Sequence, residues 1–212
     1  MTPDLTCYLV LDEALCGARG MAETAAQAVA GGARVVQLRM KDVSTERRIA
    51  AGRAVQAAIA GRATFIVNDD VEAACGLDAD GVHVGQGDMA PARVRALIGP
   101  EKLLGLSVET EAQARRVDAR IVDHIGAGPV RATATKPGHA APVGWDGIAR
   151  IVAAAPVPAV AIGGVTAADA APAVRAGVHG LAVVSAICGQ EDPEAAARAI
   201  CAAMTRELEG AA

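Results

Sequence analysis

Residues 35–42 read VVQLRMKD, and the fold prediction starts from this stretch. Its apolar, β-favouring beginning indicates a buried strand. Side chains alternate between the two faces of a strand, so Gln37, Arg39 and Lys41 point to the same side. Two cations on one face of a buried strand are costly without an anion opposite them. The stretch alone leaves two interpretations open: a charged strand end that reaches water, or one wall of a phosphate-binding site.

Outward from this strand, the chain repeats one unit, made of a short apolar run, a loop, an Ala-rich helical stretch and a Gly turn. The predicted strands cover residues 7–11, 35–39, 64–67, 81–84, 103–106, 124–127, 159–162 and 181–184. Eight alternating βα units in about 200 residues predict a single (β/α)8 TIM barrel over residues 1–212. A doubly wound open sheet is the alternative, but the Gly-rich phosphate loop that usually follows its first strand is missing.

The helices between these strands have local signals of their own. The first predicted helix ends near Gly31-Gly32. The others cover residues 44–60, 71–75, 90–98, 110–118, 146–154, 167–176 and 193–209. Ser44 and Asp70 are the expected N-terminal caps of two of them. The longest connection, residues 128–145, reads GPVRATATKPGHAAPVGW and cannot form one helix. Long irregular connections in compact domains are usually functional or disordered.

Composition excludes several classes of function. The sequence is 52% hydrophobic with a formal net charge of −4, which argues against disorder and against broad nucleic-acid binding. No apolar run approaches the roughly 20 residues of a membrane-spanning helix, and the amino terminus lacks a signal-peptide pattern. Five cysteines without C-x-x-C spacing suggest neither a zinc site nor a disulfide framework. We therefore expect a soluble cytoplasmic protein; the Ala-rich helix faces predict no particular oligomeric state.

In a parallel barrel, functional residues gather where strands end and loops begin. Polar residues follow every predicted strand here, whereas the opposite ends carry mostly Gly and Ala. Asp69 and Asp88 are candidate Mg²⁺ ligands, because Mg²⁺ is typically held by few carboxylates together with substrate phosphates. Taken alone, each aspartate fits a turn or a helix cap better. His83 could be a general base, although a histidine hydrogen-bonded within the barrel is the simpler interpretation.

Two anion sites follow from the remaining strand ends. Arg39, Lys41 and Lys136 form a cationic set able to hold a diphosphate, with Arg supplying a bidentate fork. The glycine pair 163–164 and the turn at 184–186 follow strands seven and eight. Barrels frequently bind phosphate there through backbone N–H groups. The sequence thus predicts one magnesium-assisted anion site and one built from backbone.

Six motifs, VQLRMK, NDD, GVHVGQGD, TATKP, AIGGV and VVSAI, occur in this order over nearly the whole chain. In order and spacing they resemble the thiamine phosphate synthase family. The resemblance implies a (β/α)8 barrel transferase. Its substrates would be 4-amino-2-methyl-5-hydroxymethylpyrimidine diphosphate and a thiazole phosphate (carboxylate), and its products thiamine phosphate and pyrophosphate.

The resemblance also implies roles for individual residues. The pyrimidine diphosphate would be held by Gln37, Arg39, Lys41, Asn68, Ser107 and Lys136, of which Arg39, Lys41, Ser107 and Lys136 would be catalytic. Mg²⁺, the implied cofactor, would bind to Asp69 and Asp88. The thiazole phosphate would be held by Thr133, Thr135, Gly164, Val184 and Ser185. The implied chemistry is dissociative: pyrophosphate leaves before the thiazole nitrogen attacks.

Three positions depart from the family pattern: Met40 and Gly87 each replace a usual Glu, and Arg131-Ala132 replaces a common aromatic–Pro pair. Met40 is expected on the face opposite Arg39 and Lys41. Two alternatives stand beside the synthase, a thiazole tautomerase on the same barrel and a phosphate-binding barrel without catalysis. The retained aspartates favour the synthase over the isomerase, and the retained cations weigh against a non-catalytic barrel.

Overall fold

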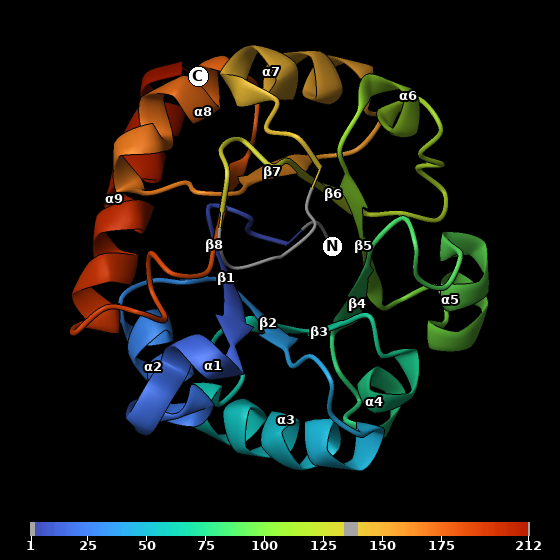
Figure 1. The fold of residues 1–212 in the computed structure, drawn as a ribbon, viewed down its shortest axis with the longest axis vertical. Helices are drawn as coiled ribbons and strands as arrows, with labels where there is room; N and C mark the ends of the chain where they lie inside the picture. Colours follow the sequence, from blue (N-terminus) through green and yellow to red (C-terminus); the bar gives the residue numbers. More distant parts are fainter. Residues whose placement is uncertain (1–2, 134–139, 212) are drawn as a thin grey trace.

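The computed structural model describes residues 3–133 and 140–211. Within these residues eight parallel strands pair in sequence order, and the last pairs with the first to close the barrel, as Figure 1 shows. The strands are β1 (Cys7–Asp12), β2 (Val35–Arg39), β3 (Thr64–Asn68), β4 (Gly81–Val84), β5 (Leu103–Val108), β6 (His124–Ala127), β7 (Ala159–Ile162) and β8 (Gly180–Val183). The predicted (β/α)8 TIM barrel is confirmed, with strand ends shifted by two residues at most.

Alternation along each strand separates two cores. Leu9 and Leu11 belong to the large core between strands and helices, whereas Tyr8 and Val10 belong to a smaller core inside the barrel. Each strand presents its own inward set in the same way, because side chains alternate with period two. Arg39 and Gln37 therefore share the inward face of β2, as predicted.

The helix predicted to end near Gly31-Gly32 is confirmed at that end, and the helical stretch before it consists of three pieces. These are α1 (Glu13–Cys16), the 3₁₀ turn η1 (Gly17–Arg19) and α2 (Met21–Ala30). Gly17 and Gly20 have φ values of 54° and 78°. Positive φ is incompatible with a right-handed helix and is readily adopted by glycine, so the chain turns at both positions.

The next helices begin at the predicted caps. The side chain of Ser44 accepts a hydrogen bond from Arg47 N–H at the start of α3 (Thr45–Ile59). The side chain of Asp70 accepts one from Ala73 N–H at the start of α4 (Val71–Gly76). Both oxygens satisfy N–H groups that have no partner within the helix. They also fix where the loops after β2 and β3 end.

The remaining helices complete the outer ring in Figure 1. They are α5 (Pro91–Ile98), α6 (Glu111–Ala114), α7 (Gly144–Ala154), η2 (Ala167–Asp169), α8 (Ala170–Arg175) and α9 (Pro193–Ala211). The prediction of a helix over 110–118 is too long. Asp118 accepts hydrogen bonds from the backbone and side chain of Arg120, and such local bonds compete with helix continuation.

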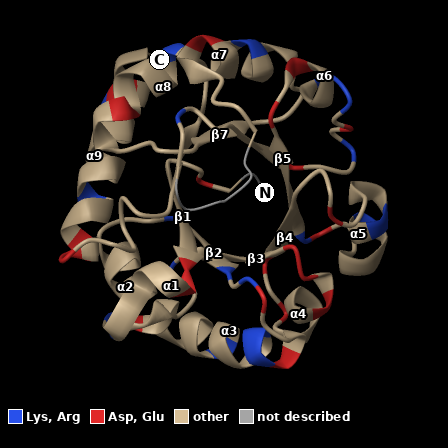
Figure 2. Cartoon of the chain, viewed as in Figure 1, with Lys and Arg blue, Asp and Glu red and all other residues tan. Residues whose placement is uncertain are grey.

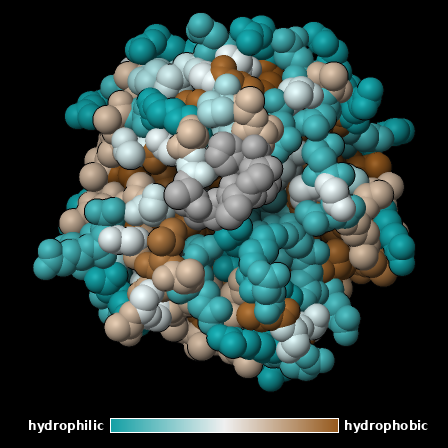
Figure 3. All heavy atoms as spheres, in the orientation of Figure 1, coloured by the Kyte–Doolittle hydropathy of each residue, from teal (hydrophilic) through white to brown (hydrophobic). Residues whose placement is uncertain are grey.

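Charged side chains lie mainly on the helices and loops, as Figure 2 shows. In Figure 3, hydrophilic residues gather over the part of the barrel formed by β2, β3 and β4. None of the helices in the described ranges is both long and apolar enough to cross a membrane. Charged residues therefore lie mostly outside the strands of the barrel. On the face seen in Figure 3, hydrophilic residues are most abundant near β2, β3 and β4.

Candidate active site

A cavity of about 670 Å³ lies at the carboxyl ends of the strands. Eleven of the predicted site residues line it together. They are Gln37, Arg39, Lys41, Asn68, Asp69, Asp88, Ser107, Thr133, Gly164, Val184 and Ser185. Thr135 and Lys136, the other two predicted residues, lie outside the described residues. The convergence follows from the fold, because parallel strands in a barrel bring all their carboxyl ends to one face.

The end of β2 is held by partners on β1. Arg39 forms an ion pair with Asp12, and both side chains are almost buried. Asp12 also caps α1 by accepting a hydrogen bond from Leu15 N–H at 3.3 Å. Deeper in the barrel, Gln37 donates to the Tyr8 hydroxyl at 2.7 Å. Asp12 and Tyr8 were not predicted from the sequence, and together they fix the direction of the polar side chains of β2.

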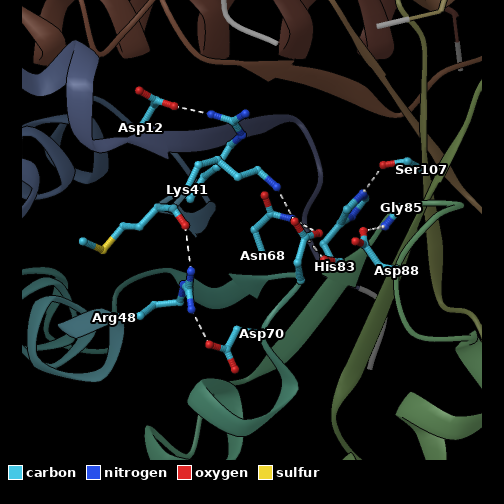
Figure 4. Close-up of polar contacts among 12 residues, drawn as sticks. Asp12, Lys41, Arg48, Asn68, Asp70, His83, Gly85, Asp88 and Ser107 are labelled. Atoms are coloured by element: carbon cyan, nitrogen blue, oxygen red, sulfur yellow. Dashed lines mark hydrogen bonds and ion pairs between the residues drawn. The ribbon is translucent and has the colours of Figure 1, made fainter. Parts of the chain in front are cut away.

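Lys41, two residues beyond Arg39, forms an ion pair with Asp69, which also accepts a hydrogen bond from Asn68 (Figure 4). Asp69 has a φ of 64°, in the left-handed region. Asp and Asn visit this region more readily than most residues, yet the conformation still costs free energy and is concentrated at functional sites. The loop after β3 therefore holds the Asp69 carboxylate in a defined position against a cation.

Asp88 lies beside Asp69 and affects its titration. Burial raises the pKa of Asp69 and the hydrogen-bonded Asp88 carboxyl raises it further, while Lys41 opposes both. Two neighbouring carboxyl groups disfavour the doubly ionised state unless a cation lies between them. Gly85 N–H donates to Asp88 at 2.7 Å and keeps it in place (Figure 4). A Cβ at Gly87 would meet open space, and the Gly85–Asp88 contact is present with glycine at position 87.

The Asp69–Asp88 pair fits a magnesium ion. Its oxygens are hard donors and the two carboxyl groups lie together, with Lys41 paired to Asp69 where the ion would bind. Among the described residues, no group of three or more His, Cys, Asp and Glu side chains could hold a metal. Two carboxylates without further protein ligands match Mg²⁺, which keeps waters and takes substrate phosphates as its other ligands.

Arg48 connects the two loops that carry Lys41 and Asp69. Its Nη2 donates to the carbonyl oxygen of Met40 at 2.8 Å, and its guanidinium forms an ion pair with Asp70 (Figure 4). Met40 and Asp70 directly neighbour Lys41 and Asp69 in the chain. The Met40 side chain is buried in the outer core, on the face opposite Lys41, as alternation predicts.

His83 is hydrogen-bonded within the barrel, in agreement with the simpler of its two interpretations. Its Nε2 lies 3.0 Å from Ser107 Oγ, and its ring stacks at a tilt on His124, with the centroids 5.7 Å apart. A Cβ at Gly105 would lie 2.3 Å from His83 Nδ1 and 2.6 Å from His124 Nε2. The two histidines fit inside the barrel only because position 105 is glycine, and the contact between His83 and Ser107 lies at the cavity.

His124 is fully buried, and neither ring nitrogen has a hydrogen-bond partner within the described residues. Burial lowers the pKa of His124 from 6.5 to about 4, although Asp123 acts in the opposite direction. Between these two pH values the unfolded chain binds a proton that the folded protein excludes. The stability that this group contributes is therefore fully present above pH 6.5, and it falls by about 1.4 kcal/mol per pH unit as the pH decreases toward 4.

We expect His124→Gln to reduce this slope when unfolding free energy is measured by urea denaturation between pH 4 and 7. The control variant, His179→Gln, changes an exposed histidine and should keep the slope of the parent protein. Equal slopes for the parent and His124→Gln would contradict a neutral, buried His124.

The far side of the cavity consists mainly of backbone and apolar groups. Gly163 and Gly164 follow β7, and Val184 and Ser185 follow β8. Both glycines have positive φ, 100° and 67°, and a Cβ at Gly163 would lie 2.5 Å from Pro129 Cβ. This turn therefore requires glycine, and it exposes peptide groups to the cavity. Thr166 and Glu109 also line the cavity, although neither was predicted from the sequence.

Known proteins resemble this chain over nearly its whole length. The family described as thiamine monophosphate synthase matches residues 7–187. The thiamine-phosphate synthase of Xanthobacter autotrophicus is 46% identical over 202 residues, covering 95% of this chain and 96% of its own. That of Solidesulfovibrio magneticus is 52% identical over 196 residues, covering 92% and 93%. The solved thiamine phosphate pyrophosphorylase of Pyrococcus furiosus superposes with a TM-score of 0.87 at 30% identity, covering 98% of each chain.

Proposed function

The chain belongs to the thiamine monophosphate synthase family, whose curated relatives are transferases, and from this premise we propose its substrates and mechanism. The substrates are 4-amino-2-methyl-5-hydroxymethylpyrimidine diphosphate and a thiazole phosphate (carboxylate). The products are thiamine phosphate and pyrophosphate, and carbon dioxide is also released when the thiazole carries the carboxylate. The observation that supports this choice is a single cavity that joins the Lys41–Asp69–Asp88 cluster of β2–β4 to the glycine turn and Ser185 of β7–β8. Two phosphorylated substrates need two such anion sites.

In this proposal the first site holds the diphosphate through Arg39, Lys41 and Asn68. Arg39 keeps one side of its guanidinium on Asp12 and has further N–H donors for phosphate oxygens. The bond between the pyrimidine methylene carbon and pyrophosphate breaks first, with both electrons leaving on the phosphate oxygen. Preplaced positive charge stabilises the departing anion, so these residues act through electrostatics and position, without a covalent intermediate on the protein.

Asp69 and Asp88 would hold Mg²⁺ at the same site. When bound, the ion neutralises charge on the phosphate oxygens. The protein's own part is to keep the two carboxylates together, which Asn68 does for Asp69 and Gly85 N–H does for Asp88.

The second site holds the thiazole phosphate on Thr133, Gly164, Val184 and Ser185, and the thiazole nitrogen attacks the pyrimidine carbocation. Thr135 and Lys136 are assigned to the two substrates as predicted from the sequence. Apolar side chains of Val160 and Ile162 line the cavity and limit access of water, which would otherwise capture the carbocation. We place the reaction in the cytoplasm, where the free cysteines would stay reduced.

A product assay tests this proposal. Purified protein with both substrates and Mg²⁺ should form thiamine phosphate and pyrophosphate in equal amounts, and EDTA should stop both. Absence of product at saturating substrates would contradict the substrate assignment. Product formation that EDTA leaves unchanged would contradict the role of Asp69 and Asp88 as magnesium ligands.

A further inference from the structure

Arg131 joins the loop after β6 to the turn after β7. Its backbone N–H donates to the carbonyl oxygen of Gly163 at 3.0 Å. Its side-chain Nη1 donates to the carbonyl oxygen of Gly164, also at 3.0 Å. One residue therefore binds two successive carbonyl groups of the glycine turn, so both point toward Arg131.

Asp169 fixes the guanidinium that makes the second of these bonds. Its two carboxylate oxygens accept from Arg131 Nη1 at 2.9 Å and Nη2 at 2.5 Å, and it also accepts from Thr166 N–H at 2.9 Å. Asp169 is only 5% exposed. Burial alone would raise its pKa, but the bonds from Arg131 and Thr166 outweigh burial and lower it. The planar fork of arginine on a buried carboxylate gives a defined geometry that a lysine cannot reproduce.

The orientation of these carbonyl groups determines where the N–H groups point. In a planar trans peptide, the C=O of one residue and the N–H of the next point in opposite directions. The N–H groups of Gly164 and Val165 are therefore directed away from Arg131. Neither has an acceptor in the part of the chain that the structure describes. Two successive free N–H groups in a turn with positive φ form a nest that binds anions.

The turn lines the cavity, but the two residues that hold the turn do not. Gly163, Gly164 and Val165 line the cavity, whereas Arg131 and Asp169 are not among the lining residues. The Arg131 guanidinium thus has its bonds on the side of the turn remote from the ligand space. In this arrangement its effect on a ligand runs through the peptides that it orients.

We propose that Arg131 and Asp169 are positioning residues for the phosphate of the second substrate. Together they clamp the turn at Gly163–Gly164 so that the N–H groups of Gly164 and Val165 face a phosphate in the cavity. The inference rests on the proposed function in one respect, the assignment of the thiazole phosphate to this turn. It adds that affinity for phosphate depends on an ion pair that contacts no substrate.

Two variants remove the clamp from opposite sides, Arg131→Lys and Asp169→Asn. For each we expect the KM for the thiazole phosphate to rise about tenfold, the effect of losing roughly one charge-assisted hydrogen bond. The KM for the pyrimidine diphosphate and kcat at saturation should change less than about threefold, because the first site keeps its residues. The dissociation constant of inorganic phosphate, measured by calorimetry without either substrate, should rise by the same factor as the KM.

A matched control is the pair Arg120–Asp118, which is also joined by two bonds, at 3.0 and 2.7 Å, but neither of these residues lines the cavity. Arg120→Lys and Asp118→Asn should keep the parent values of every constant. Thermal unfolding identifies any variant that fails to fold. If Arg131→Lys or Asp169→Asn fails to fold, the kinetic and phosphate-binding constants of the other variant test the clamp.

The outcomes distinguish the clamp from direct binding of phosphate by Arg131. If Arg131 bound phosphate directly, Asp169→Asn would free the guanidinium and leave phosphate affinity unchanged or tighter, which would overturn the clamp. Parent values for both variants in an active enzyme would overturn it too, while the proposed function stands. If the parent protein formed no product, the function would fail, and the inorganic phosphate constants would still decide the clamp.

Discussion

Replacing Asp69 with asparagine is expected to lower kcat about a thousandfold, since a lost metal carboxylate removes several kcal/mol of charge stabilisation and each 1.4 kcal/mol is a factor of ten. Asn tolerates the left-handed backbone at this position, where φ is 64°, so the barrel should remain folded. Asp69→Ala should lose turnover to a similar extent, with an added backbone cost. Steady-state kinetics at saturating substrates and Mg²⁺, with circular dichroism to verify folding, provide the measurement.

The chain offers a close control in Asp78. It too has positive φ, 47°, and pairs with a lysine, Lys102, at 2.6 Å, but it does not line the cavity. Asp78→Asn should therefore retain parent turnover. A parent kcat for Asp69→Asn would contradict a role of Asp69 in the mechanism. Equal losses of kcat in Asp69→Asn and Asp78→Asn would mean that the effect is structural.

Replacing Lys41 with glutamine is expected to reduce kcat by about 10²- to 10³-fold, the usual cost of removing one preplaced group that stabilises developing negative charge. The Lys41 side chain is about half exposed, at 49%, so its loss should leave the unfolding free energy nearly unchanged. Rates of pyrophosphate release at saturating concentrations of both substrates measure the effect. Lys102→Gln, which removes the partner of Asp78, is the matched control and should behave as the parent protein.

The outcome for Lys41 also distinguishes two roles. A rise in KM for the pyrimidine diphosphate with kcat unchanged would mean that Lys41 binds the ground state and the departing pyrophosphate equally. That result would contradict its assignment to charge that develops as the bond breaks. A fall in kcat, with KM affected much less, is the predicted pattern.

The barrel and most of the cavity could be predicted because both depend on local pattern. Apolar runs alternate with helical stretches, and Arg39, Asp69 and Ser107 stand directly at strand ends. Parallel strands in a closed barrel then bring those ends together without further information. Gln37 and Arg39 face the interior for the same local reason, the two-residue period of a strand.

Long-range partners could not be predicted in this way. Asp12 pairs with Arg39 across 27 positions, and Asp169 pairs with Arg131 across 38. Both aspartates look like ordinary turn or cap residues in sequence, and each does take part in a cap or capping turn. Their second role depends on which loops become neighbours around the barrel, so the sequence identifies Arg131 only as a departure from the family pattern.

The contact between the interior histidines could not be predicted from the sequence for a different reason. His83 could be placed on a strand, but its contact with His124 depends on the missing Cβ at Gly105. A glycine within a strand signals close approach of some group, without indicating which. The break of the first helical stretch at Gly17 and Gly20 has a similar origin, because glycine permits positive φ but does not require it.

The central claim is that the Lys41–Asp69–Asp88 cluster binds the diphosphate together with Mg²⁺. Calorimetric titration of pyrophosphate into the purified protein, with Mg²⁺ and then with EDTA, tests it most directly, because no turnover is needed. We predict binding in Mg²⁺ that weakens at least about tenfold in EDTA, in line with loss of a Lewis-acid contact, and weak binding to Asp69→Asn under both conditions. Equal affinity with and without Mg²⁺, or parent affinity in Asp69→Asn, would contradict the account.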